Sequence, residues 1–96
     1  QAGRLWWYLY DAGGFPEAQW EIIGGDWYYF DESGWVQTGW KFIGDAWYYL
    51  NESGAMLSKG WHWIDGSCYY MDASGKMMTD TWIDGSYVNS SGVWIP

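Results

Sequence analysis

Short segments in which apolar and polar residues alternate recur along the chain, and each is followed by a run of aromatic residues. The clearest example is residues 39–50, which read Gly-Trp-Lys-Phe-Ile-Gly-Asp-Ala-Trp-Tyr-Tyr-Leu. The alternation is typical of half-buried strands, and Gly44-Asp45 has the composition of a two-residue β-hairpin loop. Related units occupy residues 19–30 and 60–71, and none of them has helical periodicity. The pattern therefore predicts a chain of short β-hairpins.

The hairpin units return at a nearly constant spacing. Trp7, Trp27 and Trp47 lie 20 residues apart, and Cys68 follows after 21. Such a period is the signature of a repeat architecture, and a two-stranded hairpin is marginal unless it stacks on its neighbours. We therefore expect one all-β domain over residues 1–96, a ββ-solenoid of stacked hairpins with a truncated first repeat and a C-terminal capping hairpin. The repeats are expected at about residues 1–18, 19–38, 39–59, 60–79 and 80–96.

The loops predict which side chains share a face. A two-residue loop places Trp20 across from Tyr29, and because side chains alternate along a strand, Trp27 shares their face. In the third unit Cys68 stands where the others have a second Trp, and Trp63 is predicted directly across from it. The opposite face is expected to form the solenoid core, from Tyr28, Phe30, Tyr48, Leu50 and Tyr69.

The composition narrows the possible ligands. Aromatic residues make up 24% of the chain, and the net charge is −8. Nucleic acids and anionic membranes need a basic surface, so both are disfavoured, whereas a cationic ligand is favoured. No apolar run is long enough to cross a bilayer, and no secretory signal opens the chain. We expect a mature or excised fragment of a longer polypeptide.

Three motifs recur in phase: Gly-Trp at residues 39–40, Trp-Tyr-Tyr at 47–49 and Gly-x-Met at 54–56. Together they resemble the choline-binding repeat of Gram-positive cell-wall proteins, which occurs in autolysins, phage lysins and surface adhesins. The resemblance covers essentially the whole chain. It implies a left-handed ββ-solenoid with choline between consecutive hairpins, boxed by two Trp of one repeat and a Tyr of the next, often over a Met. It also implies a secreted, cell-wall-associated module that binds choline of teichoic and lipoteichoic acids and carries no catalytic machinery.

Carried over by position, the resemblance implies a series of choline boxes. The first would consist of Trp20, Trp27, Tyr49 and Met56. The second would consist of Trp40, Trp47, Tyr70 and Met77. The third departs from the pattern at Cys68, and we expect it to be rebuilt from Trp61, Trp63 and Tyr87. A weaker fourth candidate pairs Trp7 with Tyr29.

The alignment of the last unit is ambiguous because that unit is short. Counted from its turn, Tyr87 matches Cys68; counted from Gly92, it matches Tyr70. Trp35 and Trp94 are expected to be packing or capping residues.

Aromatic boxes suit choline because its quaternary ammonium has no N–H to donate, while its methyl shell is apolar and carries positive charge. The faces of Trp and Tyr satisfy both properties. Each face contributes roughly 0.5–2 kcal/mol, so a single box should bind around the millimolar range. A polymer with many choline groups would engage several boxes at once.

Other interpretations remain open. Carbohydrate-binding repeats of the clostridial toxin or glucan-binding type resemble these units distantly, although a Trp-x₆-Trp pair suits a cage better than a flat platform. A structural spacer, with homodimers formed through exposed terminal hairpins, is another possibility. A nucleophilic pair of Cys68 and His62 is disfavoured because the predicted register puts them on opposite faces. No His/Cys spacing suggests a metal site, and we expect neither a metal nor a cofactor.

Overall fold

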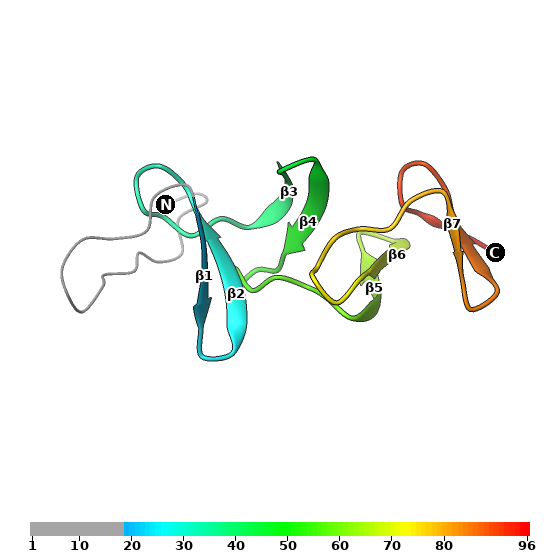
Figure 1. Cartoon of the computed structure of the whole chain (residues 1–96), viewed down its shortest axis with the longest axis horizontal. Helices are drawn as coiled ribbons and strands as arrows, with labels where there is room; N and C mark the ends of the chain where they lie inside the picture. The colour runs from blue at the N-terminus through cyan, green and yellow to red at the C-terminus, as the bar shows by residue number, and fades with distance from the viewer. Residues whose placement is uncertain (1–18) are drawn as a thin grey trace. The chain divides into compact units, whose positions relative to one another are not determined.

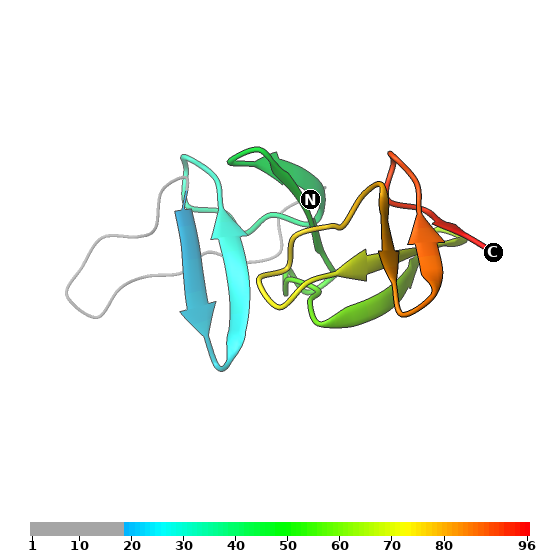
Figure 2. The same ribbon diagram turned by 45° about the vertical axis from the view of Figure 1, so that its right-hand side comes forward.

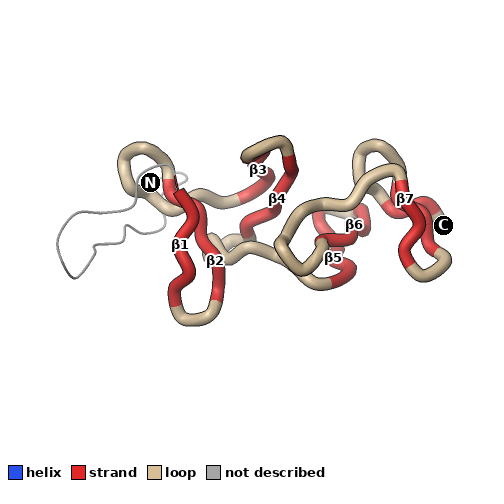
Figure 3. Tube along the Cα trace, viewed as in Figure 1, coloured by secondary structure: helices blue, strands red, loops and turns tan. Residues whose placement is uncertain are grey.

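The computed structural model describes residues 19–96, which form short strands joined by turns (Figure 1). The strands are β1 (Gln19–Ile23), β2 (Asp26–Phe30), β3 (Gly39–Ile43), β4 (Ala46–Leu50), β5 (Gly60–Ile64), β6 (Ser67–Met71), β7 (Thr81–Ile83), β8 (Ser86–Val88) and β9 (Trp94–Ile95). Figure 3 shows only strand and loop in this part of the chain, which confirms the predicted all-β class. No bilayer-spanning helix occurs among these residues. The expected first repeat, with Trp7, lies outside the described residues.

Consecutive strands pair across the predicted loops. β1 pairs with β2, β3 with β4 and β5 with β6, and β7, β8 and β9 form one three-stranded sheet (Figure 2). Both loop residues have positive φ angles in every hairpin from β1 to β8, as type I′ turns require. The loops are Gly24-Gly25, Gly44-Asp45, Asp65-Gly66 and Asp84-Gly85. Glycine and aspartate at these positions thus set where each hairpin turns.

The strand register agrees with the register predicted from the loops. In the first hairpin Trp20 lies opposite Tyr29, and in the third Trp61 lies opposite Tyr70. The predicted pairing of Trp63 with Cys68 is also confirmed. Because cross-strand partners share a face, the aromatic side chains of each hairpin gather on one side of it.

The last hairpin is shorter at its loop end. β5 and β6 form five ladder pairs, whereas β7 and β8 form three. Tyr87 pairs with Trp82 at a ring separation of 5.1 Å, the same separation that joins Tyr70 to Trp61. Tyr87 therefore corresponds to Tyr70, which settles the alignment in favour of counting from Gly92.

The core lies at the ends of the second strands. The last residue of each is fully buried: Phe30, Leu50, Met71 and Val88 are all 0% exposed. Each of them pairs with the residue six positions later, in the pairs Phe30–Val36, Leu50–Met56, Met71–Met77 and Val88–Trp94. The three core-face tyrosines at positions 28, 48 and 69 are only half-buried. The core of each repeat is thus a small contact, not a broad apolar face.

The turn after each second strand is held by one side chain. Its first residue is Asp or Asn, and the Oδ1 atom accepts hydrogen bonds from the backbone N–H groups two and four residues later, at 2.8–3.0 Å. These residues are Asp31, Asn51, Asp72 and Asn89. The side chain mimics a backbone acceptor and adds to the backbone hydrogen bonds of the turn, such as the one from the N–H of Gly34 to the carbonyl oxygen of Asp31.

Two glycines of these turns pack where a side chain would not fit. Gly54 has a φ of 92°, and a Cβ added there would lie 2.7 Å from Cγ2 of Val36. Gly92 has a φ of 82°, and its Cβ would lie 2.5 Å from Sδ of Met77. Each turn therefore rests on the core-pairing residue of the preceding repeat.

The described residues group by their contacts into two units. The first comprises residues 19–41 and 49–56, and the second comprises residues 42–48 and 57–96. Two of the three boundaries fall inside the hairpin of β3 and β4, so neither unit is a whole number of repeats.

Candidate functional site

Each hairpin carries one indole in contact with one phenol. The ring centroids are 5.1 Å apart in all four hairpins, and the planes are inclined by 66°, 68°, 70° and 55°. The pairs are Trp20–Tyr29, Trp40–Tyr49, Trp61–Tyr70 and Trp82–Tyr87. Inclined aromatic pairs are favourable beyond their burial. The contact therefore fixes the orientation of the indole against the phenol within each hairpin.

In the first unit, the backbone joins three parts of the predicted first box. The N–H of Met56 donates to the carbonyl oxygen of Trp27 at 2.9 Å, and Met56 also pairs with Leu50. Leu50 directly follows Tyr49, and Trp27 shares a hairpin face with Trp20. The indole of Trp27 remains 42% exposed, so it is available to a ligand.

The second unit repeats this arrangement around Trp47. The N–H of Met77 donates to the carbonyl oxygen of Trp47 at 2.9 Å, and Met77 pairs with Met71, the residue after Tyr70. Trp47 is 42% exposed, as Trp27 is. Trp47 and Met77 line a hollow of about 470 Å³, together with Asp45, Asp72 and Lys76 among others. Trp40, the remaining member of the predicted second box, contacts Tyr49 in the first unit.

In the third hairpin, the second indole lies on the first strand instead of the second strand. Cys68 is buried at 6% exposure, whereas Trp63 opposite it is 69% exposed and Trp61 is 38% exposed. Burial raises the pKa of the Cys68 thiol above its ordinary value, and a backbone hydrogen bond involving Tyr69 partly offsets this rise. This cross-strand pair therefore has a small buried thiol, Cys68, on the second strand and a large exposed indole, Trp63, on the first.

Trp94 lies against this exchanged indole. Its ring centroid is 6.3 Å from that of Trp63, and the two planes are inclined by 89°. Trp94 pairs with Val88 as Met56 pairs with Leu50, so it occupies the position of the methionine in the other repeats. Sequence reasoning assigned Trp94 to packing or capping and missed this place. The constant step of six residues from the buried strand end could have revealed it.

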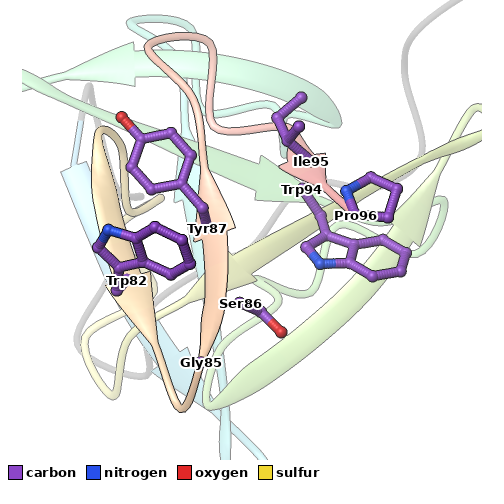
Figure 4. Close-up of a pocket in the computed structure, with 7 residues that line it drawn as sticks. All are labelled: Trp82, Gly85, Ser86, Tyr87, Trp94, Ile95 and Pro96. Carbon is purple, nitrogen blue, oxygen red and sulfur yellow. The ribbon is translucent and has the colours of Figure 1, made fainter.

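The last hairpin has an incomplete aromatic face. Figure 4 shows the rings of Trp82 and Tyr87 side by side on one side of β8, and Trp94 beside Pro96 on the other. A hollow of about 620 Å³ is lined by these four residues with Ile95, Ser86 and Gly85. Trp82 is 69% exposed, and the shortened strands provide no second indole beside it.

The structure separates the two residues of the disfavoured catalytic pair. His62 lies opposite Tyr69 and Cys68 lies opposite Trp63, so the two side chains alternate to different faces. Nε2 of His62 lies 2.9 Å from the carbonyl oxygen of Ser58 instead. Within residues 19–96, no three His, Cys, Asp or Glu residues gather as they would to hold a metal ion.

Comparison with known proteins identifies the family. A sequence model described as the choline-binding repeat matches residues 19–61 and 37–82. The chain belongs to the choline-binding repeat family. The comparison with curated proteins gives no match.

Solved choline-binding repeat structures resemble the chain closely. CbpJ of Streptococcus pneumoniae has a TM-score of 0.89 and 39% identity over 99% of this chain and 32% of its own. A choline-binding domain from the same organism has a TM-score of 0.78 and 37% identity over 84% of this chain and 98% of its own. The multimodular cell-wall endolysin of phage Cp-1, solved with choline, has a TM-score of 0.75 and 40% identity over 94% of this chain and 28% of its own.

The similarity to these structures confirms the predicted fold class, a ββ-solenoid of short hairpins. The chain spans about a third of the length of CbpJ. Membership in the family makes the chain a module of choline-binding repeats.

Proposed function

We propose that the chain is a non-catalytic wall-attachment module that binds the choline groups of teichoic and lipoteichoic acids in aromatic boxes. The repeated pairing of a half-exposed indole with a methionine carries this proposal. The N–H of Met56 donates to the carbonyl oxygen of Trp27, and the N–H of Met77 donates to that of Trp47 in the same way. Both indoles are 42% exposed. Large rings left partly exposed at the same place in two repeats offer apolar surface that a ligand can cover.

The proposed boxes combine residues of successive repeats. The first contains Trp20, Trp27, Tyr49 and Met56. The second contains Trp40, Trp47, Tyr70 and Met77. The third contains Trp61, Trp63 and Tyr87, and the equivalence of Tyr87 to Tyr70 in the ladder supports this assignment. A fourth, weaker box of Trp7 and Tyr29 lacks an upstream Trp, and its Trp7 lies outside the described residues.

The binding mechanism follows from the chemistry of the trimethylammonium group. Its methyl groups pack on apolar ring faces, and its charge is attracted by the electron-rich face of each ring. Three faces contribute about 1.5–6 kcal/mol before the cost of immobilising the ligand, so one box binds weakly. Linked boxes on a polymer gain about 10²–10⁴ in affinity over one box. The net charge of −8 also raises the local concentration of a cation.

A surface location is part of the same proposal. The relatives include a multimodular cell-wall endolysin, and one relative was solved in the presence of a peptidoglycan analogue. We locate this module outside the cell, at a Gram-positive wall. CbpJ and the endolysin are both about three times as long as this chain, which supports a catalytic or adhesive domain elsewhere in the parent protein.

Retention on a resin of immobilised tertiary amines tests this function. An acidic protein also binds such a resin by ion exchange, so the column is washed with concentrated NaCl before elution with free choline. Specific binding predicts retention through the NaCl wash and release by choline. A Trp27→Ala, Trp47→Ala double variant should be released earlier than the parent chain. Release by NaCl alone or by free sugar instead of choline would refute choline attachment, and release by sugar would favour a carbohydrate-binding module.

A further inference from the structure

The first two proposed boxes each contain a methionine, Met56 or Met77, which we call the floor of the box. In the third box, Trp94 occupies the equivalent position. We propose that Trp94 is a ligand-contacting wall of this box and makes it select for positive charge more strongly than the methionine-floored boxes do. This inference rests on the proposed choline function and adds a specificity that differs from box to box. Position, ring geometry and side-chain chemistry support it separately.

The position of Trp94 follows from two sets of backbone pairs. Trp94 pairs with the buried Val88 just as Met77 pairs with the buried Met71. In the repeat before, the N–H of Met77 donates a hydrogen bond to the carbonyl oxygen of Trp47, the second Trp of the preceding hairpin. Here Val93, the neighbour of Trp94, pairs with Tyr69, the neighbour of Cys68. Trp94 therefore comes next to the strand position at which the usual second Trp is missing.

The ring geometry fits two adjacent walls. The planes of Trp63 and Trp94 are inclined by 89° with centroids 6.3 Å apart. The two indoles thus meet edge to face, so Trp94 lies directly beside Trp63 of the third box, at a separation close to the roughly 6 Å reach of a cation–π interaction. Trp63 is 69% exposed, so its surface is open to a ligand.

The chemistry of the two floors differs in one respect. A methionine thioether gives an apolar, polarisable contact, whereas an indole gives that contact and a negative ring face. Choline and 3,3-dimethylbutan-1-ol have nearly the same shape, but a neutral carbon replaces the charged nitrogen in the alcohol. An added indole face should therefore improve choline binding more than it improves binding of the neutral alcohol.

The experiment measures both ligands at separate boxes of the same chain. The chain is labelled with 5-fluorotryptophan, and each ¹⁹F signal is assigned by single substitution. Titrations with choline and with 3,3-dimethylbutan-1-ol give two Kd values for the third box, from Trp61 and Trp63, and two for the first, from Trp27. The ratio of neutral to charged Kd is expected to be about 2- to 25-fold larger at the third box.

Three variants isolate the role of Trp94. Trp94→Met should lower the ratio at the third box to that of the first, whereas Trp94→Phe, which keeps an aromatic face, should retain most of the difference. The reciprocal Met56→Trp variant should raise the ratio at the first box. As a control, Trp35→Met makes the same chemical change in the turn after β2 and should leave the third box unchanged.

Equal ratios at the two boxes in the parent chain would overturn the inference, as would an unchanged third-box ratio in a folded Trp94→Met variant. If Trp94→Met does not fold, the parent and Trp94→Phe ratios still decide. A choline response of Trp27 without any response of Trp61 and Trp63 would leave the proposed function standing and remove this inference. No choline response at any box would refute both.

Discussion

The hairpins β1–β2 and β5–β6 share one frame and differ in where an aromatic wall stands. Both have five ladder pairs, and both hold a Trp–Tyr contact at 5.1 Å. In the first hairpin Trp27 lies on the second strand opposite Ile22. In the third, the indole is Trp63 on the first strand, opposite Cys68. The strand pairing is the same in both hairpins, but the exposed indole lies on the second strand in one and on the first strand in the other.

In these two hairpins, the exposed indole comes from one or the other member of the same cross-strand pair. Exchanging the large member of the pair keeps one large and one small side chain on the face. The exchange has a consequence for exposure, because Trp63 is 69% exposed whereas Trp27 is 42% exposed. The moved indole meets Trp94 in place of a methionine.

The largest expected effect tests whether the frame is common to both hairpins. Phe30 and Met71 end their second strands and are both 0% exposed. We expect Phe30→Ala to lower the free energy of unfolding by about 3–5 kcal/mol and Met71→Ala by about 2–5 kcal/mol, because each leaves a cavity. Repeat arrays need not unfold in one step, so amide hydrogen exchange in β2 and β6 is the measurement. A loss below about 1 kcal/mol in one hairpin only would show that the two frames are not equivalent.

A second prediction tests the exchange itself. Cys68→Trp introduces a second large ring across from Trp63 at a site that is only 6% exposed, and overpacking should cost about 1–3 kcal/mol of unfolding free energy. Adding Trp63→Ile recreates the pair found in the first hairpin and should recover most of the loss. A double-mutant cycle by urea unfolding measures the coupling. Additive effects of the two substitutions would mean that the ladder partners do not compensate.

A third prediction concerns ligand binding by the moved wall. Trp63→Ile should weaken choline binding at the third box by about 2- to 25-fold, since one ring face is lost. Phe42→Ile is the matched control, because Phe42 contacts Trp47 at 5.2 Å and its replacement leaves that second indole intact. The third-box variant should therefore lose more affinity in a fluorine NMR titration. Equal losses would indicate that Trp63 contributes only packing.

The smallest expected effect is a pH dependence of stability that arises from the buried thiol of Cys68. The pKa of Cys68 is raised mainly by burial, so the folded chain keeps its thiol proton at a pH where the unfolded chain releases it. The associated stability is fully present below the unfolded pKa and is lost as the pH rises through the folded pKa. The stability difference between the parent chain and Cys68→Ala should thus shrink at alkaline pH in thermal unfolding. A difference independent of pH would contradict the raised pKa.

Most of the frame could be predicted from local sequence because loops determine register. Gly24-Gly25 and Asp65-Gly66 are two-residue loops, and once each is located, every pair in its hairpin follows. Tyr87 could not be aligned in this way. Its distance from the loop and its distance from Gly92 suggest different alignments, and only the ladder shows that the missing pairs were lost at the loop end.

Local pattern also predicts the box residues on one hairpin, whereas their neighbours on the next hairpin were implied only by the family resemblance. Alternation alone puts Trp20 and Trp27 on one face. The step of six residues puts Trp94 beside Val88, but its contact with Trp63 depends on pairing between segments about 30 positions apart. The same holds for the half-burial of the core-face tyrosines, which depends on how closely successive turns pack.

By itself, the sequence determined the hairpins, their loops, their register and the shared face of the aromatic residues, because these depend on φ preferences and on the two-residue alternation of a strand. The tertiary structure decided which residues lie beside one another across repeats: Met56 at Trp27, Met77 at Trp47 and Trp94 at Trp63. Those neighbours result from the stacking of turns such as Gly92 on Met77, where packing distances rather than local backbone preferences set the contact.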